Sequence, residues 1–219
     1  MAELVDALGL GSSEFIRGGS SPLIDTMNYK NHSAIYSSNK KLYEPVILDC
    51  PYAEQINPGL IEWIKKDITT MTFDGEALRT DFLSTRNELP CNELQSLFDW
   101  IDTKTVECAD SIAQYTRTAY IDSPSEDKKF SIADYWGMCY NKGSHAVLHN
   151  HWPYAMSFAY YINCPEGSSP LVLEGNEIQV TEGRLVVFAS HMDHKVDPCP
   201  VDNRFMIAGD ISYAGVAQW

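Results

Sequence analysis

The sequence predicts an α+β protein in which a helical layer comes first and a mainly β core follows. Apolar residues at helical spacing are confined to about residues 54–120, whereas short apolar and aromatic runs recur at strand-like intervals over about 130–213. Closely spaced short strands favour a sandwich or barrel over a parallel sheet. The chain has 219 residues, 44% of them hydrophobic, which is enough for one full core. We therefore expect a single domain over residues 27–219.

Residues 1–26 differ from the rest in being rich in Gly and Ser without clear periodicity. Within them, MAELVDALGLGSS and RGGSSPL resemble the product of translating a leucine tRNA gene. We expect a flexible or spurious N-terminal extension, with Met27 as the true start. The alternative is a natural flexible N terminus. Neither interpretation assigns these residues a function.

Two stretches show the pattern of amphipathic helices. In NPGLIEWIKKD, Asn57–Asp67, an Asn cap is followed by Pro in the first turn, and apolar residues then repeat at helical spacing. A longer helix is predicted over Asn92–Tyr120, where apolar residues recur every three or four positions. The polar run DSPSEDKK, 122–129, separates these helices from the β part.

Strands are predicted from short apolar or aromatic runs bounded by turn residues. Before the helices, the apolar run VIL lies within a stretch, 34–49, that suggests one or two strands. In the β part the predicted strands are Phe130–Tyr140, Met156–Ile162, Pro170–Leu173, Glu177–Val180, Arg184–Phe188 and Phe205–Ser212.

The charge balance is strongly acidic, with 16 basic residues against 30 acidic ones and a net charge of −14. Such a field repels nucleic acid and anionic membranes, and the sequence contains no basic patch to counter it. No segment approaches the roughly 20 apolar residues of a membrane span. The six cysteines include no CxxC pair. We expect a reduced, cytoplasmic protein with neither nucleic acid nor membrane as partner; the sequence leaves its oligomeric state open.

Five of the six histidines lie between residues 145 and 194, and two of them are one residue apart in LHNHWPYAMSFAYYI. On a strand, His149 and His151 point the same way. Neutral imidazole is the commonest metal ligand, so a third donor is expected from SHMDHKV, where His191 and His194 would face opposite sides. Surface or hydrogen-bonded core histidines are the alternative. Paired imidazoles compete for desolvation and protons, which favours a metal site.

Three segments, HNHWPYAMSFAYYI, EGRLVVFASHMDHKVDP and NRFMIAGDIS, resemble the 2-oxoglutarate- and Fe(II)-dependent oxygenase superfamily. Within it they are most similar to a small branch with a His-x-His and distal His iron site. The resemblance covers about Trp136 to Ser212. It implies a double-stranded β-helix, which is a cupin-like jelly roll, with N-terminal helices packed on it. It also implies a dioxygenase of hydroxylase type.

The resemblance assigns roles residue by residue. His149 and His151 match the paired metal ligands, and His194 matches the distal ligand. Arg204 stands where the family places the arginine that binds the distal carboxylate of 2-oxoglutarate. Tyr140 is a candidate to supply a hydroxyl to this cosubstrate, with Tyr160 or Tyr161 as alternatives. The implied cofactors are Fe(II) and 2-oxoglutarate, and no catalytic residue is assigned beyond the metal ligands.

The chain departs from the superfamily pattern at two positions. The usual middle ligand is a carboxylate, so His151 leaves the metal site one negative charge short. Asp193 is a candidate substitute, but on a regular strand it would face away from His194, and we rank it below His151. A small hydroxyl residue often follows the arginine by two positions; here that residue is Met206, which removes one hydrogen bond to the carboxylate.

Two other functions are consistent with the residues. One is a three-histidine, cupin-type metal dioxygenase or isomerase that works without 2-oxoglutarate, which the histidine set favours and Arg204 opposes. The other is a non-catalytic metal-binding jelly roll. The substrate, a small molecule or a peptide, is not readable from the sequence. We expect its contacts to come from loops such as Arg79–Pro90 and Ser123–Lys129.

Overall fold

The computed structural model describes residues 44–68, 75–85, 87–113 and 130–213. The chain divides into two units, Met1–Leu42 and Tyr43–Trp219, and every described residue belongs to the second. The predictions made for residues 1–26 and 122–129 fall outside the described residues.

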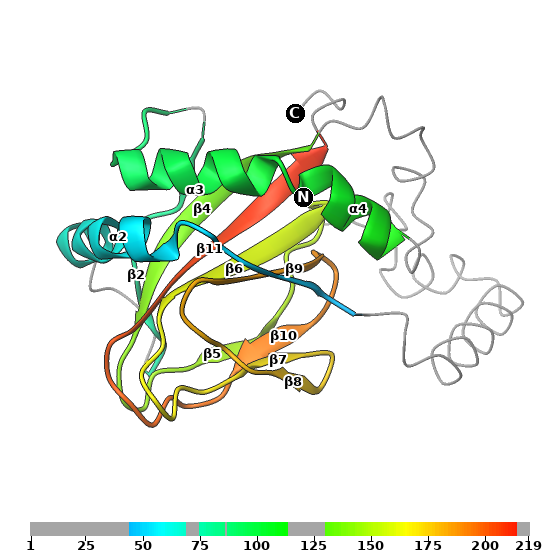
Figure 1. The fold of residues 1–219 in the computed structure, drawn as a ribbon. Helices are drawn as coiled ribbons and strands as arrows, with labels where there is room; N and C mark the ends of the chain where they lie inside the picture. Colours follow the sequence, from blue (N-terminus) through cyan, green and yellow to red (C-terminus); the bar gives the residue numbers. More distant parts are fainter. Residues whose placement is uncertain (1–43, 69–74, 86, 114–129, 214–219) are drawn as a thin grey trace, which may run out of the picture. The chain divides into compact units, whose positions relative to one another are not determined.

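Two antiparallel sheets form the core of this unit (Figure 1). The larger sheet has the order β1 (Val46–Asp49), β9 (Arg184–Ala189), β6 (Met156–Asn163), β11 (Arg204–Tyr213), β4 (Phe130–Tyr140) and β2 (Leu78–Arg79), with β3 (Leu83–Ser84) also pairing with β4. The smaller sheet has the order β5 (Ala146–His149), β10 (His194–Val196), β7 (Leu171–Leu173) and β8 (Asn176–Ile178). The predicted fold, a double-stranded β-helix with helices packed on it, is thereby confirmed.

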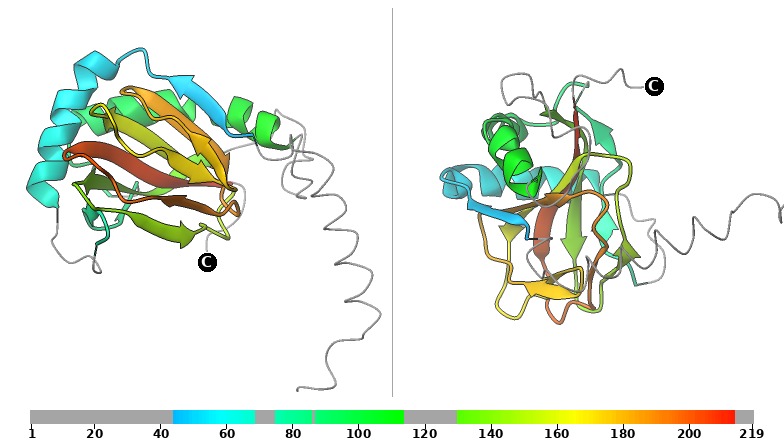
Figure 2. Two further views of the ribbon diagram at one scale, coloured as in Figure 1. Left: turned by 90° about the horizontal axis from the view of Figure 1, so that it is seen from below. Right: turned by 90° about the vertical axis from the view of Figure 1, so that its right-hand side faces the viewer.

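Within the described ranges, three helices accompany the sheets: α2 (Ala53–Asp67), α3 (Asn92–Asp102) and α4 (Thr105–Ala113). Helices α2 and α3 lie along the outer face of the larger sheet, opposite the smaller sheet (Figures 1 and 2). Their apolar stripes are fully buried there, including Ile64 of α2 and Leu97 of α3. Gly137 of β4 permits the close approach, because a Cβ atom at this position would overlap the side chain of Ile64.

The first helix begins earlier than its sequence pattern indicates. It starts at Ala53, and Asn57 is a buried residue inside it rather than its cap. The Asn57 amide donates a hydrogen bond to the backbone oxygen of Ile162 (2.9 Å) and accepts one from the Tyr160 hydroxyl (2.8 Å). The polar side chain that resembled a cap therefore joins the helix to β6.

The second predicted helix is two helices in the structure. Helix α3 ends at Asp102 and α4 begins at Thr105. At the break, the hydroxyl of Thr105 donates to the backbone oxygen of Asp102 (3.0 Å), which occupies a carbonyl that a continuous helix would use. The part of the prediction beyond Ala113 lies outside the described residues.

The longer predicted strands agree with the structure to within about two residues, and β4 has the predicted bounds, Phe130–Tyr140. The two strands that carry or precede the histidines, β5 and β10, are shorter and carried no separate prediction of their bounds. Strand β5 ends at His149, so His151 lies just beyond it instead of on it.

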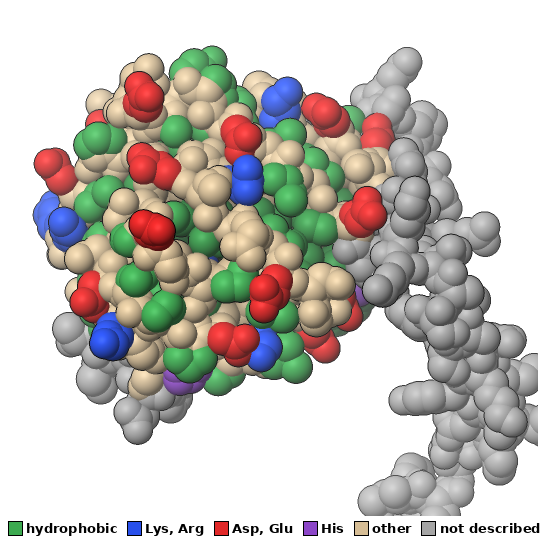
Figure 3. Space-filling view, turned by 60° about the horizontal axis from the view of Figure 1, so that its bottom comes forward, with side chains coloured by type: hydrophobic (Ala, Val, Ile, Leu, Met, Phe, Trp, Pro, Cys, Tyr) green, Lys and Arg blue, Asp and Glu red, His purple; other side chains and the backbone are tan. Residues whose placement is uncertain are grey.

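Acidic side chains are spread over the face shown in Figure 3, with few basic ones among them. The negative charge expected from the composition is therefore distributed over this face and not gathered in one cluster. No helix in the described part of the chain is long and apolar enough to cross a membrane.

We expect Asn57→Ala to lower the free energy of unfolding by about 2–3 kcal/mol, because it leaves the Tyr160 hydroxyl and a buried carbonyl without their partner. Urea denaturation measures this. Gln95→Ala is the matched control, since this amide is hydrogen-bonded but exposed (Gln95 Nε2 to Asp99 Oδ1, 2.7 Å), and its effect should stay within about 0.5 kcal/mol. Equal effects of the two substitutions would contradict the role assigned to Asn57.

Candidate active site

The three predicted metal ligands lie together at one end of the jelly roll. His149, the last residue of β5, is the register partner of His194, the first residue of β10, and their ring centroids are 4.3 Å apart. The His151 ring lies 5.0 Å from each of them. The potential ligand atoms of the three all lie within 4.8 Å of one another. Their role as metal ligands stays a prediction, but the geometry that it requires is present.

Two of these imidazoles are oriented by backbone carbonyls. His149 Nδ1 lies 2.7 Å from the oxygen of Val147, and His194 Nδ1 lies 3.1 Å from the oxygen of Met192. A carbonyl oxygen only accepts, so the proton sits on Nδ1 in both rings and Nε2 keeps its lone pair. Both rings therefore present the nitrogen that a metal binds.

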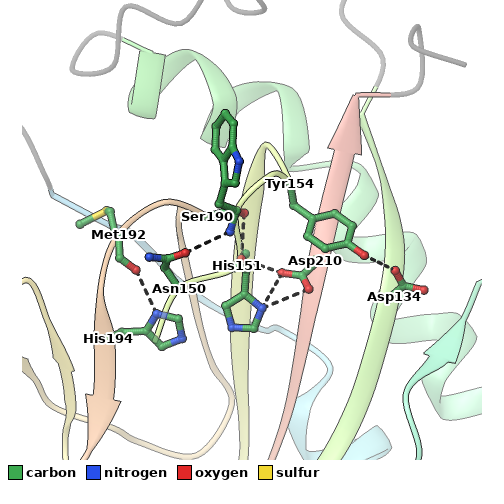
Figure 4. A network of polar contacts seen from close by, with 10 residues as sticks. Asp134, Asn150, His151, Tyr154, Ser190, Met192, His194 and Asp210 are labelled. Carbon is green, nitrogen blue, oxygen red and sulfur yellow. Dashed lines mark hydrogen bonds and ion pairs between the residues drawn. The ribbon is translucent and has the colours of Figure 1, made fainter. Parts of the chain in front are cut away.

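The third imidazole, His151, is oriented by a carboxylate. Its Nδ1 lies 3.2 Å from both oxygens of Asp210 (Figure 4). Asp210 is only 3% exposed and accepts a further hydrogen bond from the Ser157 hydroxyl (2.7 Å), which in turn contacts the Ser190 hydroxyl (2.8 Å). The sequence analysis did not identify Asp210. The signal available was its even spacing from Arg204, which immediately precedes the predicted strand Phe205–Ser212; such spacing places both on one face if the strand begins one residue earlier.

Asp193, the candidate substitute ligand, has a different role. It is exposed and accepts a hydrogen bond from the Asn150 amide (2.8 Å), which ties the segment between the two paired histidines to the start of β10 (Figure 4). His191 lies in the turn before β10 and is exposed. Among the described residues, only His149, His151 and His194 form a cluster of potential metal ligands, so neither residue joins it.

The electrostatics of the cluster favour neutral imidazoles. Partial burial lowers the pKa of His149. Burial, with a smaller contribution from His149, lowers the pKa of His194 to about 4. A neutral imidazole is the form that binds metals, so these two rings need not lose a proton at neutral pH.

Arg204 lies at the opposite end of β11 from Asp210 and is 0% exposed. Its guanidinium lies 4.4 Å from the ring centroid of Tyr140 and 5.3 Å from that of Tyr161. None of its three nitrogens has a hydrogen-bond partner among the described residues, and neither does the buried hydroxyl of Tyr161. Burying a charge without a partner is costly, so this arrangement indicates a site for an anion.

The two tyrosines beside Arg204 both line the cavity described below. Burial raises the pKa of Tyr140 and of Tyr161, against the opposing effect of the Arg204 charge, so both phenols keep their protons. The Tyr140 hydroxyl lies 3.8 Å from the sulfur of Met138. Tyr160 faces the helices, where it bonds Asn57, and is excluded as a source of a hydroxyl for the cavity.

A cavity of about 270 Å³ connects these two regions. The three histidines line it, as do Tyr140, Tyr161 and Met206. Met206 is 5% exposed, so a thioether occupies the place where a hydroxyl was expected. Its register partner on β6 is Tyr161, whose free hydroxyl lies in the same region.

One wall of the cavity is a row of aromatic rings in contact with one another. The Trp136 ring is stacked on His151 at 5.5 Å and 15°, and Phe82 packs edge-on against Trp136 at 4.6 Å. The guanidinium of Arg79 lies 4.4 Å from the centre of the Phe82 ring, which is 58% exposed. Arg79 and Phe82 belong to the first of the two loops expected to contact substrate; the second lies outside the described residues.

No family model and no curated protein matches this sequence. Solved structures do match in fold. A prolyl-4-hydroxylase from Pseudomonas putida is 13% identical, with a TM-score of 0.55, over 78% of this chain and 93% of that one. A viral collagen prolyl hydroxylase from Paramecium Bursaria Chlorella virus-1, in a 2OG complex, is 16% identical, with a TM-score of 0.55, over 80% and 97%. The α-ketoglutarate-dependent epimerase SnoN from nogalamycin biosynthesis is 10% identical, with a TM-score of 0.57, over 84% and 82%.

These neighbours define the class of fold. The chain has the double-stranded β-helix of the 2-oxoglutarate- and Fe(II)-dependent oxygenases, as its sequence motifs predicted. At 10–16% identity, the likeness concerns the fold alone. What the chain does with this fold depends on its own residues.

The lowered pKa of His194 makes the stability of the metal-free protein depend on pH. The unfolded chain, with a histidine pKa of about 6.5, binds a proton that the folded protein binds only near pH 4. The free energy of unfolding should therefore fall as the pH decreases from 6.5 to 4, by about 3 kcal/mol from this residue. Urea denaturation at several pH values measures this. His194→Gln should reduce the slope; an unchanged slope would contradict the assignment.

Proposed function

We propose that this protein is an Fe(II)- and 2-oxoglutarate-dependent oxygenase of hydroxylase type. One observation carries the proposal: the buried guanidinium of Arg204 and the buried hydroxyl of Tyr161 have no hydrogen-bond partner among the described residues. Both lie beside a cavity that three converging imidazoles also line. A metal alone would not require Arg204. A ligand that binds a metal at one end and carries a carboxylate at the other would use both groups.

The histidine cluster fits Fe(II). Three imidazoles with free Nε2 atoms converge at the cavity wall and would hold the metal there. Imidazole suits Fe, Zn, Cu and Ni, so the donor set permits iron without selecting it. The fold class and the arginine favour iron over the other metals.

The far end of the cavity fits a carboxylate. A guanidinium forms two parallel hydrogen bonds to a carboxylate, and an anion there would remove the cost of the unpaired charge. The hydrogen bond that Met206 cannot make is available from Tyr161, its cross-strand neighbour. Tyr140 lies on the other strand beside Arg204, as register partner of the arginine. Together these residues would hold the distal carboxylate of 2-oxoglutarate.

The residues of this chain would bind and orient the reactants. Bound Fe(II) and 2-oxoglutarate supply the activation of O₂ for oxidation of a C–H bond. His149, His151 and His194 would hold the metal, and Arg204 with Tyr161 would fix the cosubstrate. Phe188, which packs edge-on against His194 at 4.9 Å, restricts access of water to the metal side.

The substrate would approach along the wall formed by Arg79, Phe82, Trp136 and His151. Its exposed member, Phe82, offers a ring face or edge next to the cavity mouth. Such a wall favours an apolar or ring-bearing group of a small molecule or peptide. Neither nucleic acid nor membrane is proposed as a partner.

A three-histidine dioxygenase or isomerase without 2-oxoglutarate is the second candidate. The all-histidine cluster favours it, because such sites have no carboxylate ligand. This function would leave the buried charge of Arg204 without a role, so we rank it second. A non-catalytic metal-binding jelly roll is ranked third for the same reason.

Anaerobic titration tests the function directly. Fe(II) alone should bind without strong visible absorption, and later addition of 2-oxoglutarate should produce the charge-transfer band of its iron chelate. Tight Fe(II) binding with no band and no binding of 2-oxoglutarate would support the second candidate instead. Absence of metal binding would mean that the histidine cluster is structural.

We expect Arg204→Met to bind Fe(II) normally but to bind 2-oxoglutarate at least about 30-fold more weakly, the low end of the loss expected for a buried charge pair. The same substitution should stabilise the ligand-free protein by about 1–4 kcal/mol, because it removes an unpaired buried charge. Calorimetric titration and thermal unfolding measure the two effects. Arg184→Met is the matched control, since Arg184 begins β9, a strand of the same sheet separated from β11 by β6, and pairs with Asp49 at 3.3 Å. If Arg184→Met weakened 2-oxoglutarate binding as much, Arg204 would not be its ligand.

A further inference from the structure

The three histidines differ in the groups behind them. His149 and His194 each bond a neutral backbone carbonyl, whereas His151 bonds a buried carboxylate. His151 is also the residue that occupies the position where the superfamily carries a carboxylate ligand. The negative charge that is absent from the ligand position is thus present on Asp210, which contacts the ring of His151.

Asp210 is held toward His151 by a closed ring of contacts. The Ser190 hydroxyl contacts Ser157 Oγ (2.8 Å), Ser157 donates to Asp210 (2.7 Å), and Asp210 accepts from His151 Nδ1 (3.2 Å). The ring closes through the backbone, where the His151 amide donates to the Ser190 oxygen (2.7 Å). Asp210, Ser157 and Ser190 are 3%, 2% and 0% exposed, so the carboxylate is fixed and shielded from water.

Two other acidic residues near the cluster are bonded elsewhere, while Glu76, which also lines the cavity, is not a member of the histidine cluster. Asp134, the register partner of Asp210, accepts a hydrogen bond from the Tyr154 hydroxyl (2.6 Å; Figure 4). Asp193 is bonded to Asn150. Among the hydrogen bonds of the described residues, Asp210 is the only carboxylate that contacts one of the three imidazoles.

We propose that Asp210 is the anionic group of the metal centre and acts through the ring of His151. Its charge polarises the Nδ1–H bond and makes Nε2 a stronger donor to the metal. A carboxylate behind a metal-bound histidine fixes its tautomer and orientation and raises its basicity. Asp210 is a positioning residue in this role, not a ligand. The proposal rests on the metal-binding part of the proposed function.

Stacking supports this role for His151 specifically. Its ring is nearly parallel to the rings of Trp136 (5.5 Å, 15°) and His194 (5.0 Å, 14°). With the ring held by these two contacts and Nδ1 bonded to Asp210, Nε2 is the nitrogen left to bind a metal. The charge of Asp210 therefore acts on a bound metal through a single atom, Nε2 of His151.

Metal affinity of the full chain tests the proposal without any substrate. Co(II) serves as an air-stable probe with a visible spectrum, and Fe(II) is titrated under anaerobic conditions. Asp210→Asn keeps the size of the side chain and an acceptor for His151 but removes the charge. We expect it to weaken binding of both metals about 10- to 100-fold. Asp134→Asn, which removes a charge from the paired position on β4, should change affinity by less than about threefold.

A second variant separates the charge from the packing. Combining His151→Asp with Asp210→Asn moves the carboxylate from behind the histidine to the ligand position. We expect this double variant to bind Co(II) at least about tenfold more tightly than Asp210→Asn alone, since the centre again has one negative charge. Urea unfolding of the metal-free variants identifies any that do not fold. If Asp210→Asn does not fold, the double variant is compared with the unaltered protein, whose Co(II) affinity it should match to within about tenfold; a greater loss would overturn the proposal.

The outcomes distinguish the two proposals. If the unaltered protein binds neither metal, the proposed function fails and this inference fails with it. If the unaltered protein binds metal and Asp210→Asn binds it equally well, only the role of Asp210 is wrong. A double variant no better than Asp210→Asn alone would also overturn the role, because restoring the charge would then have no effect.

Discussion

The register of β11 between β4 and β6 is the constraint on which the cavity depends. Met206 and Ala208 of β11 line the cavity, and Arg204 and Asp210 occupy the alternate positions on either side of them along the same strand. A shift of one residue would turn both charges toward the helices and bring Phe205 and Ile207 into the cavity. The long pairing with β4, from Arg204 opposite Tyr140 to Tyr213 opposite Phe130, prevents such a shift.

The two buried charges at the ends of this inner face differ in how they are satisfied. Asp210 has partners within the protein, His151 and Ser157, and so contributes to a rigid site. Arg204 lies beside the rings of Tyr140 and Tyr161, and none of its nitrogens forms a hydrogen bond within the described part of the chain. A fully bonded buried group fixes a structure, whereas an unbonded one reduces stability until a ligand binds. The contrast indicates that one end of the cavity is complete in the protein alone and the other requires an added anion.

The sequence was sufficient for features that depend on local pattern. The run of aromatic and apolar residues in Phe130–Tyr140 predicts β4, and the spacing of His149 and His151 predicts a pair. The choice of His194 over His191 as their partner comes from the resemblance to the oxygenase superfamily. Features that depend on which strands are neighbours could not be predicted. Asn57 resembles a helix cap until the position of β6 is known. Asp210 is an acidic residue in a strand until the structure places it behind His151.

Both departures from the superfamily pattern have a neighbouring group that offsets them. The carboxylate absent at position 151 is offset by Asp210, which touches the His151 ring, and the hydroxyl absent at position 206 is offset by Tyr161, the cross-strand partner of Met206. Asp210 contacts the side chain at position 151, and Tyr161 lies on the strand next to position 206. Neither group is close in sequence to the position that it offsets. A site that had lost its function would not be expected to keep a buried, unpaired arginine, since a methionine there would be more stable. The presence of the buried Arg204 despite its cost in stability, together with Asp210 and Tyr161, favours a metal site that binds an anion over a jelly roll that has lost its function.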